Sequence, residues 1–128
     1  MLGTAFFGVN MPILKFLDQM EWEDPPRGYY ITDVKQKTLW INEETGATWA
    51  LIKFPPGIAD KRHTHPKANQ MILGLSGEVE MTAGSLMELH GQTAFIFKKG
   101  EEHGRTPFTK ETILLFYWDG PPDPEVVE

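Results

Sequence analysis

The chain has 128 residues, of which 41% are apolar and 23% charged, ordinary proportions for a single folded, soluble domain. Its net charge is −6 and its lysines and arginines are scattered, so it lacks the basic footprint that a nucleic-acid partner requires. It contains no cysteine, which excludes disulfides, thiolate nucleophiles and cysteine-bound zinc. Any metal must therefore be held by histidine, carboxylate, amide or water.

Residues 1–28 are expected to form an N-terminal arm. Their apolar start lacks a basic leader, and polar residues and Pro12 interrupt it well before the ~18 apolar residues of a membrane span. We therefore expect no membrane partner and a cytoplasmic location. A short helix is expected within 12–20, because Pro12 can open it and the Asp-Pro-Pro at 24–26 prevents its continuation. A flexible terminus is the alternative.

Residues 29–119 are expected to form an all-β barrel. Short runs rich in β-branched and aromatic residues recur about every ten residues, separated by Gly, Pro and Asn. Regular spacing of this kind is typical of a sandwich or barrel. Residues 120–128 contain three prolines and three acidic residues and are expected to be an extended or disordered tail. The expected strands lie in the runs GYYITDV, KTLWIN, ATWALIKF, QMILGL, GEVEMTA, TAFIF and TILLFYW.

Two histidines in the segment RHTHPKANQ are candidates for a metal site. In a strand, residues i and i+2 point to the same side, so His63 and His65 would present both imidazoles to one face. Taken alone the pair is weak evidence, because exposed histidines at a sheet edge give the same pattern.

The surrounding spacing strengthens this interpretation. From Gly57 to Gly77 the sequence reads G-x5-H-x-H-x4-Q-x6-G, which resembles the first cupin motif with Gln70 in place of the usual Glu. The segment GQTAFIFKKGEEHGRTP resembles the second motif and keeps the spacing of Gly100 and His103. It departs from that motif by one extra residue after its first Gly, by a Lys in place of Pro and by a Pro in place of Asn. These departures lie in turns.

Resemblance to the cupins implies a small β-barrel, also called a double-stranded β-helix or jelly roll, with one divalent metal ion inside one end. The implied ligands are His63, His65 and His103, with Gln70 in the fourth position. The residues themselves agree, since three imidazoles from separate strands suit Fe²⁺, Zn²⁺, Ni²⁺ or Mn²⁺. His90 lies outside the motifs and is expected to be exposed.

Gln70 bears on the chemistry of this site. A Glu would cancel one unit of metal charge, whereas a neutral amide leaves the site at +2 and favours anionic ligands such as enolates or carboxylates. The amide could ligate the metal or could hydrogen-bond a metal-bound water. The alternative is a degenerate cupin that has lost its metal.

Arg105 is a candidate catalytic residue. By strand alternation it should point into the same cavity as His103, where its guanidinium could pair with a carboxylate or enolate. The alternative is a rim arginine bridging to a surface acid such as Glu101. Phe95, Phe97, Phe116 and Trp118 are candidates for an apolar cavity wall.

A longer resemblance covers residues 37–124 and is carried by ETGATWALIKFPPG, HGRTPF and FYWDGPPDP. These segments resemble the cupin branch that contains the acetylacetone-cleaving dioxygenases and the cupin domain of certain anti-sigma factors. The former use a three-histidine Fe(II) site to cleave a C–C bond of a β-diketone, and have a non-ligating Glu where this chain has Gln70. The pectin-degradation cupins use three histidines and a Gln, but this chain lacks the Asp and Arg that they place after the last His.

The sequence thus predicts a metal-dependent cupin acting on a small anionic or enolisable substrate. The leading hypothesis is an Fe(II) dioxygenase that cleaves a C–C bond of a diketone-like compound. The alternatives are a redox-neutral isomerase or lyase with Zn, Ni or Mn, and a non-enzymatic metal- or ligand-binding module. We also expect a homodimer, formed through an edge strand or the N-terminal arm.

Overall fold

The structure is a computed structural model that describes residues 12–26 and 28–128. In these residues regular structure is confined to strands and two short 3₁₀ turns, so the predicted all-β fold is confirmed. The expected N-terminal helix is reduced to a single 3₁₀ turn, in which no side chain is buried. The elements are η1 (Leu17–Gln19), β1 (Lys35–Ile41), β2 (Thr48–Phe54), β3 (Gly57–Ile58), β4 (His63–Thr64), β5 (Gln70–Glu80), η2 (Thr82–Gly84), β6 (Leu86–Leu89), β7 (Thr93–Phe97), β8 (Pro107–Phe108), β9 (Thr112–Trp118) and β10 (Glu125–Val126).

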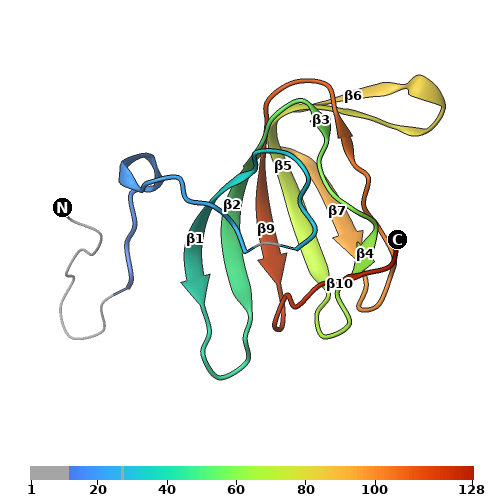
Figure 1. Cartoon of the computed structure of the whole chain (residues 1–128). Coiled ribbons are helices and arrows are strands. Elements are labelled where there is room, and N and C mark those ends of the chain that lie inside the picture. The colour runs from blue at the N-terminus through green and yellow to red at the C-terminus, as the bar shows by residue number, and fades with distance from the viewer. Residues whose placement is uncertain (1–11, 27) are drawn as a thin grey trace.

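The long strand β5 connects two parts of one curled antiparallel sheet (Figure 1). Its first half lies between β9 and β7, and β9 continues the sheet through β2 to β1. Its second half pairs with β6 and β8, and β8 pairs with β3. The register against β9 shifts between Gly74 and Ser76, where a bulge can bend the strand. This bend curls the sheet around an interior.

Strict alternation along β2 and β9 gives the sheet an inner and an outer face. Every second residue of β2 from Thr48 to Phe54, and of β9 from Thr112 to Trp118, is buried. Side chains two apart share a face, so these residues form the inner wall of the barrel. The core is completed from other elements by Val34, Ala59, Ala68, Ile72, Val79, Leu89 and Phe108.

A second, two-stranded sheet closes one side of the barrel. The tail strand β10 pairs with β4, with Val126 opposite His63 and Glu125 opposite Thr64. Residues 120–128, expected to be extended or disordered, thus place β10 beside the strand that carries the first histidine. Among the described residues, no helix is long and apolar enough to cross a membrane.

Candidate metal centre

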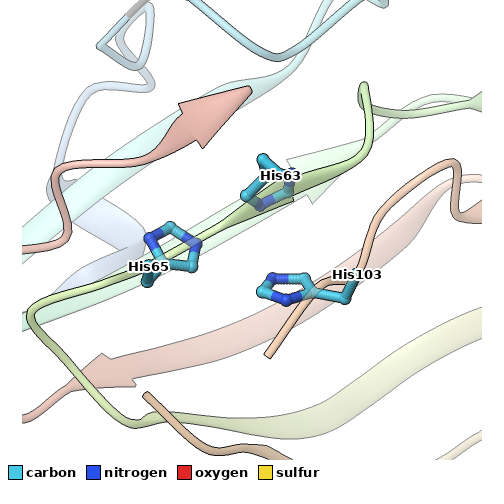
Figure 2. Close-up of side chains that lie close together, drawn as sticks. All are labelled: His63, His65 and His103. Atoms are coloured by element: carbon cyan, nitrogen blue, oxygen red, sulfur yellow. The ribbon is translucent and has the colours of Figure 1, made fainter. Parts of the chain in front are cut away.

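Three histidines that are distant in sequence lie together inside the barrel (Figure 2). His63 is in β4 and His65 follows it, while His103 comes from the loop between β7 and β8. An antiparallel bridge joins the two segments, because the His63 amide donates to the His103 carbonyl at 2.7 Å and the His103 amide donates to the His63 carbonyl at 2.9 Å. This reciprocal pair of hydrogen bonds brings together residues forty positions apart.

The three imidazoles are close enough to share one ion. One ring nitrogen from each residue can be chosen so that all three lie within 4.8 Å of one another. The ring centroids of His63 and His65 are 5.0 Å apart, and that of His103 lies 4.4 Å from His63. The predicted convergence of the His63 and His65 side chains is therefore confirmed, and the three histidines could form a metal site.

Backbone carbonyls orient all three rings. His63 Nδ1 donates to the Lys61 carbonyl at 2.6 Å, His103 Nδ1 donates to the Glu101 carbonyl at 3.2 Å, and His65 Nδ1 donates to the Pro122 carbonyl. A carbonyl can only accept, so each Nδ1 carries a proton, which leaves Nε2 as the ring nitrogen that can bind a metal. Such bonds fix the tautomer and the direction of a metal-binding imidazole.

Several potential ligand atoms are buried without a hydrogen-bond partner. Within the described residues, His65 Nε2, His103 Nε2 and Gln70 Oε1 have no accessible surface and no partner. An unpaired buried polar atom costs about 1–3 kcal/mol, so its persistence calls for an explanation such as a bound ion. The donor set of neutral nitrogens with an amide oxygen fits a divalent metal.

Burial keeps two of the histidines neutral. It lowers the pKa of His65 from 6.5 to about 4, partly opposed by the Pro122 carbonyl and assisted by His63. It lowers the pKa of His103 from 6.5 to about 4 as well, assisted by the charge of His63 and partly opposed by the Glu101 carbonyl. Both rings are therefore neutral near pH 7, with Nε2 free of a proton, which is the form that binds metals.

A cavity of about 530 Å³ adjoins the histidines. His63, His103 and Gln70 contribute to its wall, and the Phe97 ring stacks on His103 with 4.2 Å between centroids. The size is within the usual range for a small-molecule site, and an apolar wall with a few polar groups is the usual composition. Of the four aromatics predicted to line the cavity, Phe95, Phe97 and Phe116 do so, whereas Trp118 is packed in the core outside it.

A polar cluster beside His63 was not predicted from the sequence. The Tyr29 ring lies 4.2 Å from the His63 ring, and its hydroxyl donates to that of Tyr30 at 3.0 Å. Asp60 Oδ1 accepts the Thr106 amide at 2.9 Å, and its Oδ2 lies 3.9 Å from His63 Nδ1. Burial raises the pKa of Tyr29 and of Tyr30 and raises that of Asp60. The run GYYITDV favoured a strand, but only Tyr30 makes a bridge there, to Asp60.

The expectation that Arg105 points into the cavity is wrong. Arg105 is exposed and its Nη1 lies 3.3 Å from Glu128 Oε1 at the end of the tail. Strand alternation fails because His103 makes an isolated bridge and Arg105 has a φ of 52°, which turns the chain. Arg105 is thus a rim arginine, with Glu128 as its partner rather than the expected Glu101. His90 is exposed, as expected.

Comparison with solved structures shows the same fold. A proposed acetylacetone dioxygenase from Methylibium petroleiphilum is 17% identical, with a TM-score of 0.74 over 97% of this chain and 86% of that one. An acetylacetone dioxygenase from Acinetobacter johnsonii is 17% identical, with a TM-score of 0.71 over 100% of this chain and 85% of that one. The anti-sigma factor ChrR of Rhodobacter sphaeroides, solved in complex with SigE, is 20% identical, with a TM-score of 0.59 over 81% of this chain and 52% of that one.

Sequence comparison supplies the family. No curated protein matches the chain, but a family model described as the ChrR cupin-like domain matches residues 10–123, nearly its whole length. This agrees with the predicted resemblance to the cupin branch of dioxygenases and anti-sigma factors. The chain belongs to the ChrR cupin-like domain family.

Proposed function

We propose that the chain binds one divalent metal ion through His63, His65 and His103, with Gln70 as the fourth ligand. The observation that carries this proposal is the set of buried acceptor atoms without partners, His65 Nε2, His103 Nε2 and Gln70 Oε1. The Nδ1 atoms of all three histidines are already bonded to carbonyls, which leaves Nε2 for the ion.

The neutral ligand set determines what the site would attract. With three imidazoles and an amide, the ion keeps its full charge of +2 inside an apolar cavity. A small oxygenated anion, such as the enolate of a β-diketone, is the substrate class that this charge favours. The Phe95, Phe97 and Phe116 side chains in the cavity wall would contact its apolar part.

The leading reaction is oxidative cleavage of a C–C bond of a diketone-like substrate with Fe²⁺. Bound iron would supply the redox chemistry that activates O₂. The chain would orient the substrate and keep bulk water away, since the aromatic wall, the buried Tyr29 and the partly buried Tyr30 enclose the space beside the histidines. The shared fold of two acetylacetone dioxygenases supports this choice.

A redox-neutral isomerase or lyase with Zn, Ni or Mn is the second candidate. It is favoured by the tyrosine pair, because burial keeps both hydroxyls protonated and able to donate or pass on a proton near the site. A purely structural metal would need no space beside it, and the 530 Å³ cavity speaks against that alternative.

Metal titration tests the site and oxygen uptake tests the reaction. Calorimetry with Fe²⁺, Zn²⁺, Ni²⁺ and Mn²⁺ should show one site per chain, nearly abolished by His103→Ala, modestly weakened by Gln70→Ala and unaffected by the matched change His90→Ala. No binding, or equal effects of all three changes, would refute the site. The iron-loaded protein should then consume O₂ with acetylacetone; binding of iron without uptake for any β-diketone would favour the redox-neutral alternative.

A further inference from the structure

The outer face of the sheet carries an apolar row that crosses five strands. The strand register places Trp40 opposite Trp49, Trp49 opposite Tyr117, Tyr117 opposite Met71, and Met71 opposite Ile96. These residues come from β1, β2, β9, β5 and β7, which lie side by side in that order (Figure 1). Four of them are exposed, Ile96 at 66% and Trp40 at 47% being the most open. Single exposed apolar residues are normal, whereas a contiguous apolar patch of a few hundred Å² often marks an interaction site.

A second apolar row lies beside the first. Leu51, Leu115, Leu73 and Ala94 are paired in register across β2, β9, β5 and β7. Each is separated by one residue from a member of the first row, so both rows are on the same face. The outer face is therefore apolar over an area two rows wide, and not only along a single row of residues.

One corner of this face is already covered by the same chain. Lys37 and Lys53, which continue the outer side of β1 and β2, hold their ammonium groups 4.5 Å from the centre of the Trp22 ring. Lys37 is buried as a result and also donates to the Leu17 carbonyl. The segment 17–22 thus occupies this corner, while the first row remains exposed.

We propose that the outer face packs against the same face of a second copy of the chain. The central strand of the five is β9, so a two-fold axis along β9 would place Tyr117 against Tyr117 of the second copy. The same operation places Trp49 opposite Met71 and Trp40 opposite Ile96. The aromatic half of each row thus meets the aliphatic half of the other, an arrangement in which one surface complements itself.

The size of the face is consistent with the core of such an interface. Five strands about 4.8 Å apart and two rows about 7 Å apart give an apolar area of roughly 300 Å². A stable dimer buries about 800 Å² per partner and surrounds an apolar core with a polar rim, so flanking residues would supply the remainder. This contact uses the face of the sheet, not the edge strand or N-terminal arm expected from the sequence.

Solution mass tests whether the contact forms. The wild-type chain should have twice the 14.6 kDa of one chain in light scattering coupled to size exclusion, at micromolar concentration. Ile96→Glu and Met71→Glu should each raise the dissociation constant at least tenfold, because a charge would be buried between the sheets. Leu86→Glu, at a 57% exposed position on β6, is the matched control and should leave the dimer intact. Circular dichroism would show that each variant is folded.

Cross-linking tests the symmetry. The chain has no cysteine, so single cysteines can be introduced without background. Facing sheets lie about 10 Å apart, within reach of a short bis-maleimide. Tyr117→Cys on the axis should cross-link to itself, Ile96→Cys alone should not, and a mixture of Trp40→Cys and Ile96→Cys should give a heterodimeric product. A monomeric wild-type chain would overturn the proposal and leave the face to another protein or to residues 1–11. So would a dimer that neither glutamate disrupts, or cross-linking of Ile96→Cys alone.

Discussion

Replacing Gly77 with alanine should destabilise the barrel more than an ordinary turn glycine would. Gly77 has a φ of 113°, and a Cβ there would lie 2.1 Å from Thr112 Oγ1 and 2.5 Å from Thr112 Cα. Thr112 is fully buried, and its hydroxyl accepts the Glu78 amide at 3.1 Å and donates to the Lys110 carbonyl at 2.9 Å. Relief of the clash would therefore require β5 and β9 to move apart and would break these bonds.

The expected loss can be divided into two parts. The left-handed backbone costs a residue with a side chain about 1–3 kcal/mol, and overpacking of a tight contact costs about 1–3 kcal/mol more. Gly77→Ala should thus lower the free energy of unfolding by about 4 kcal/mol, a large share of the 5–15 kcal/mol typical of a domain. Gly91→Ala is the matched control, because Gly91 has a φ of 95° and nothing within 4 Å of its Cβ position. Gly91→Ala should therefore lower the free energy of unfolding only by the cost of the left-handed backbone.

Urea unfolding of the metal-free chain at pH 7 measures both variants. The difference between them isolates the close approach of β5 to β9 from the backbone preference. If Gly77→Ala lost no more stability than Gly91→Ala, Gly77 would be required only for its φ and not for the close approach of β5 to β9.

Three further predictions concern the site. Between pH 6.5 and about 4, the unfolded chain binds protons on His65 and His103 that the native chain does not bind. The metal-free protein should therefore lose stability as the pH falls through this window. Urea midpoints that stay constant across the window would contradict this. Asp60→Ala should weaken metal binding by roughly 10–100-fold in calorimetry, because it releases the loop after His103, whereas Asp60→Asn keeps an oxygen for the Thr106 amide and should lose less. Deletion of residues 121–128 should weaken binding by roughly tenfold, since it removes the carbonyl that orients His65; unchanged affinity would show that this bond is dispensable.

The sheet was predictable where burial alternates cleanly. The runs ATWALIKF and TILLFYW coincide with β2 and β9, because one face of each strand is buried and the other is not. The run GYYITDV has the same composition but forms no strand. Tyr29 instead packs against His63, and composition alone does not distinguish an aromatic residue in a sheet from one that packs over a site.

The three histidines were predictable from spacing, and their partners were not. The spacing of glycines and histidines in the motif reflects where turns bring the ligands together, so the motif can be recognised in the sequence. The groups that orient the rings are the backbone carbonyls of Lys61, Glu101 and Pro122. Every residue type has a backbone carbonyl, so the sequence does not reveal them. The predicted direction of the Arg105 side chain was wrong because alternation of side chains applies only within a strand, whereas Arg105 has a positive φ and lies in a loop.

These carbonyl contacts bear on how the site would bind its ion. The rings are held in the metal-free structure by bonds to backbone atoms, and the reciprocal bonds between His63 and His103 fix two of them relative to each other. Little conformational entropy would then be lost on binding, and the neutral rings of His65 and His103 would release few protons at pH 7. The rigidity depends on the tail, because Pro122 orients His65 and β10 pairs with β4. The candidate metal site therefore draws on β4, on the loop before β8 and on the tail, and we expect the docked tail to strengthen metal binding.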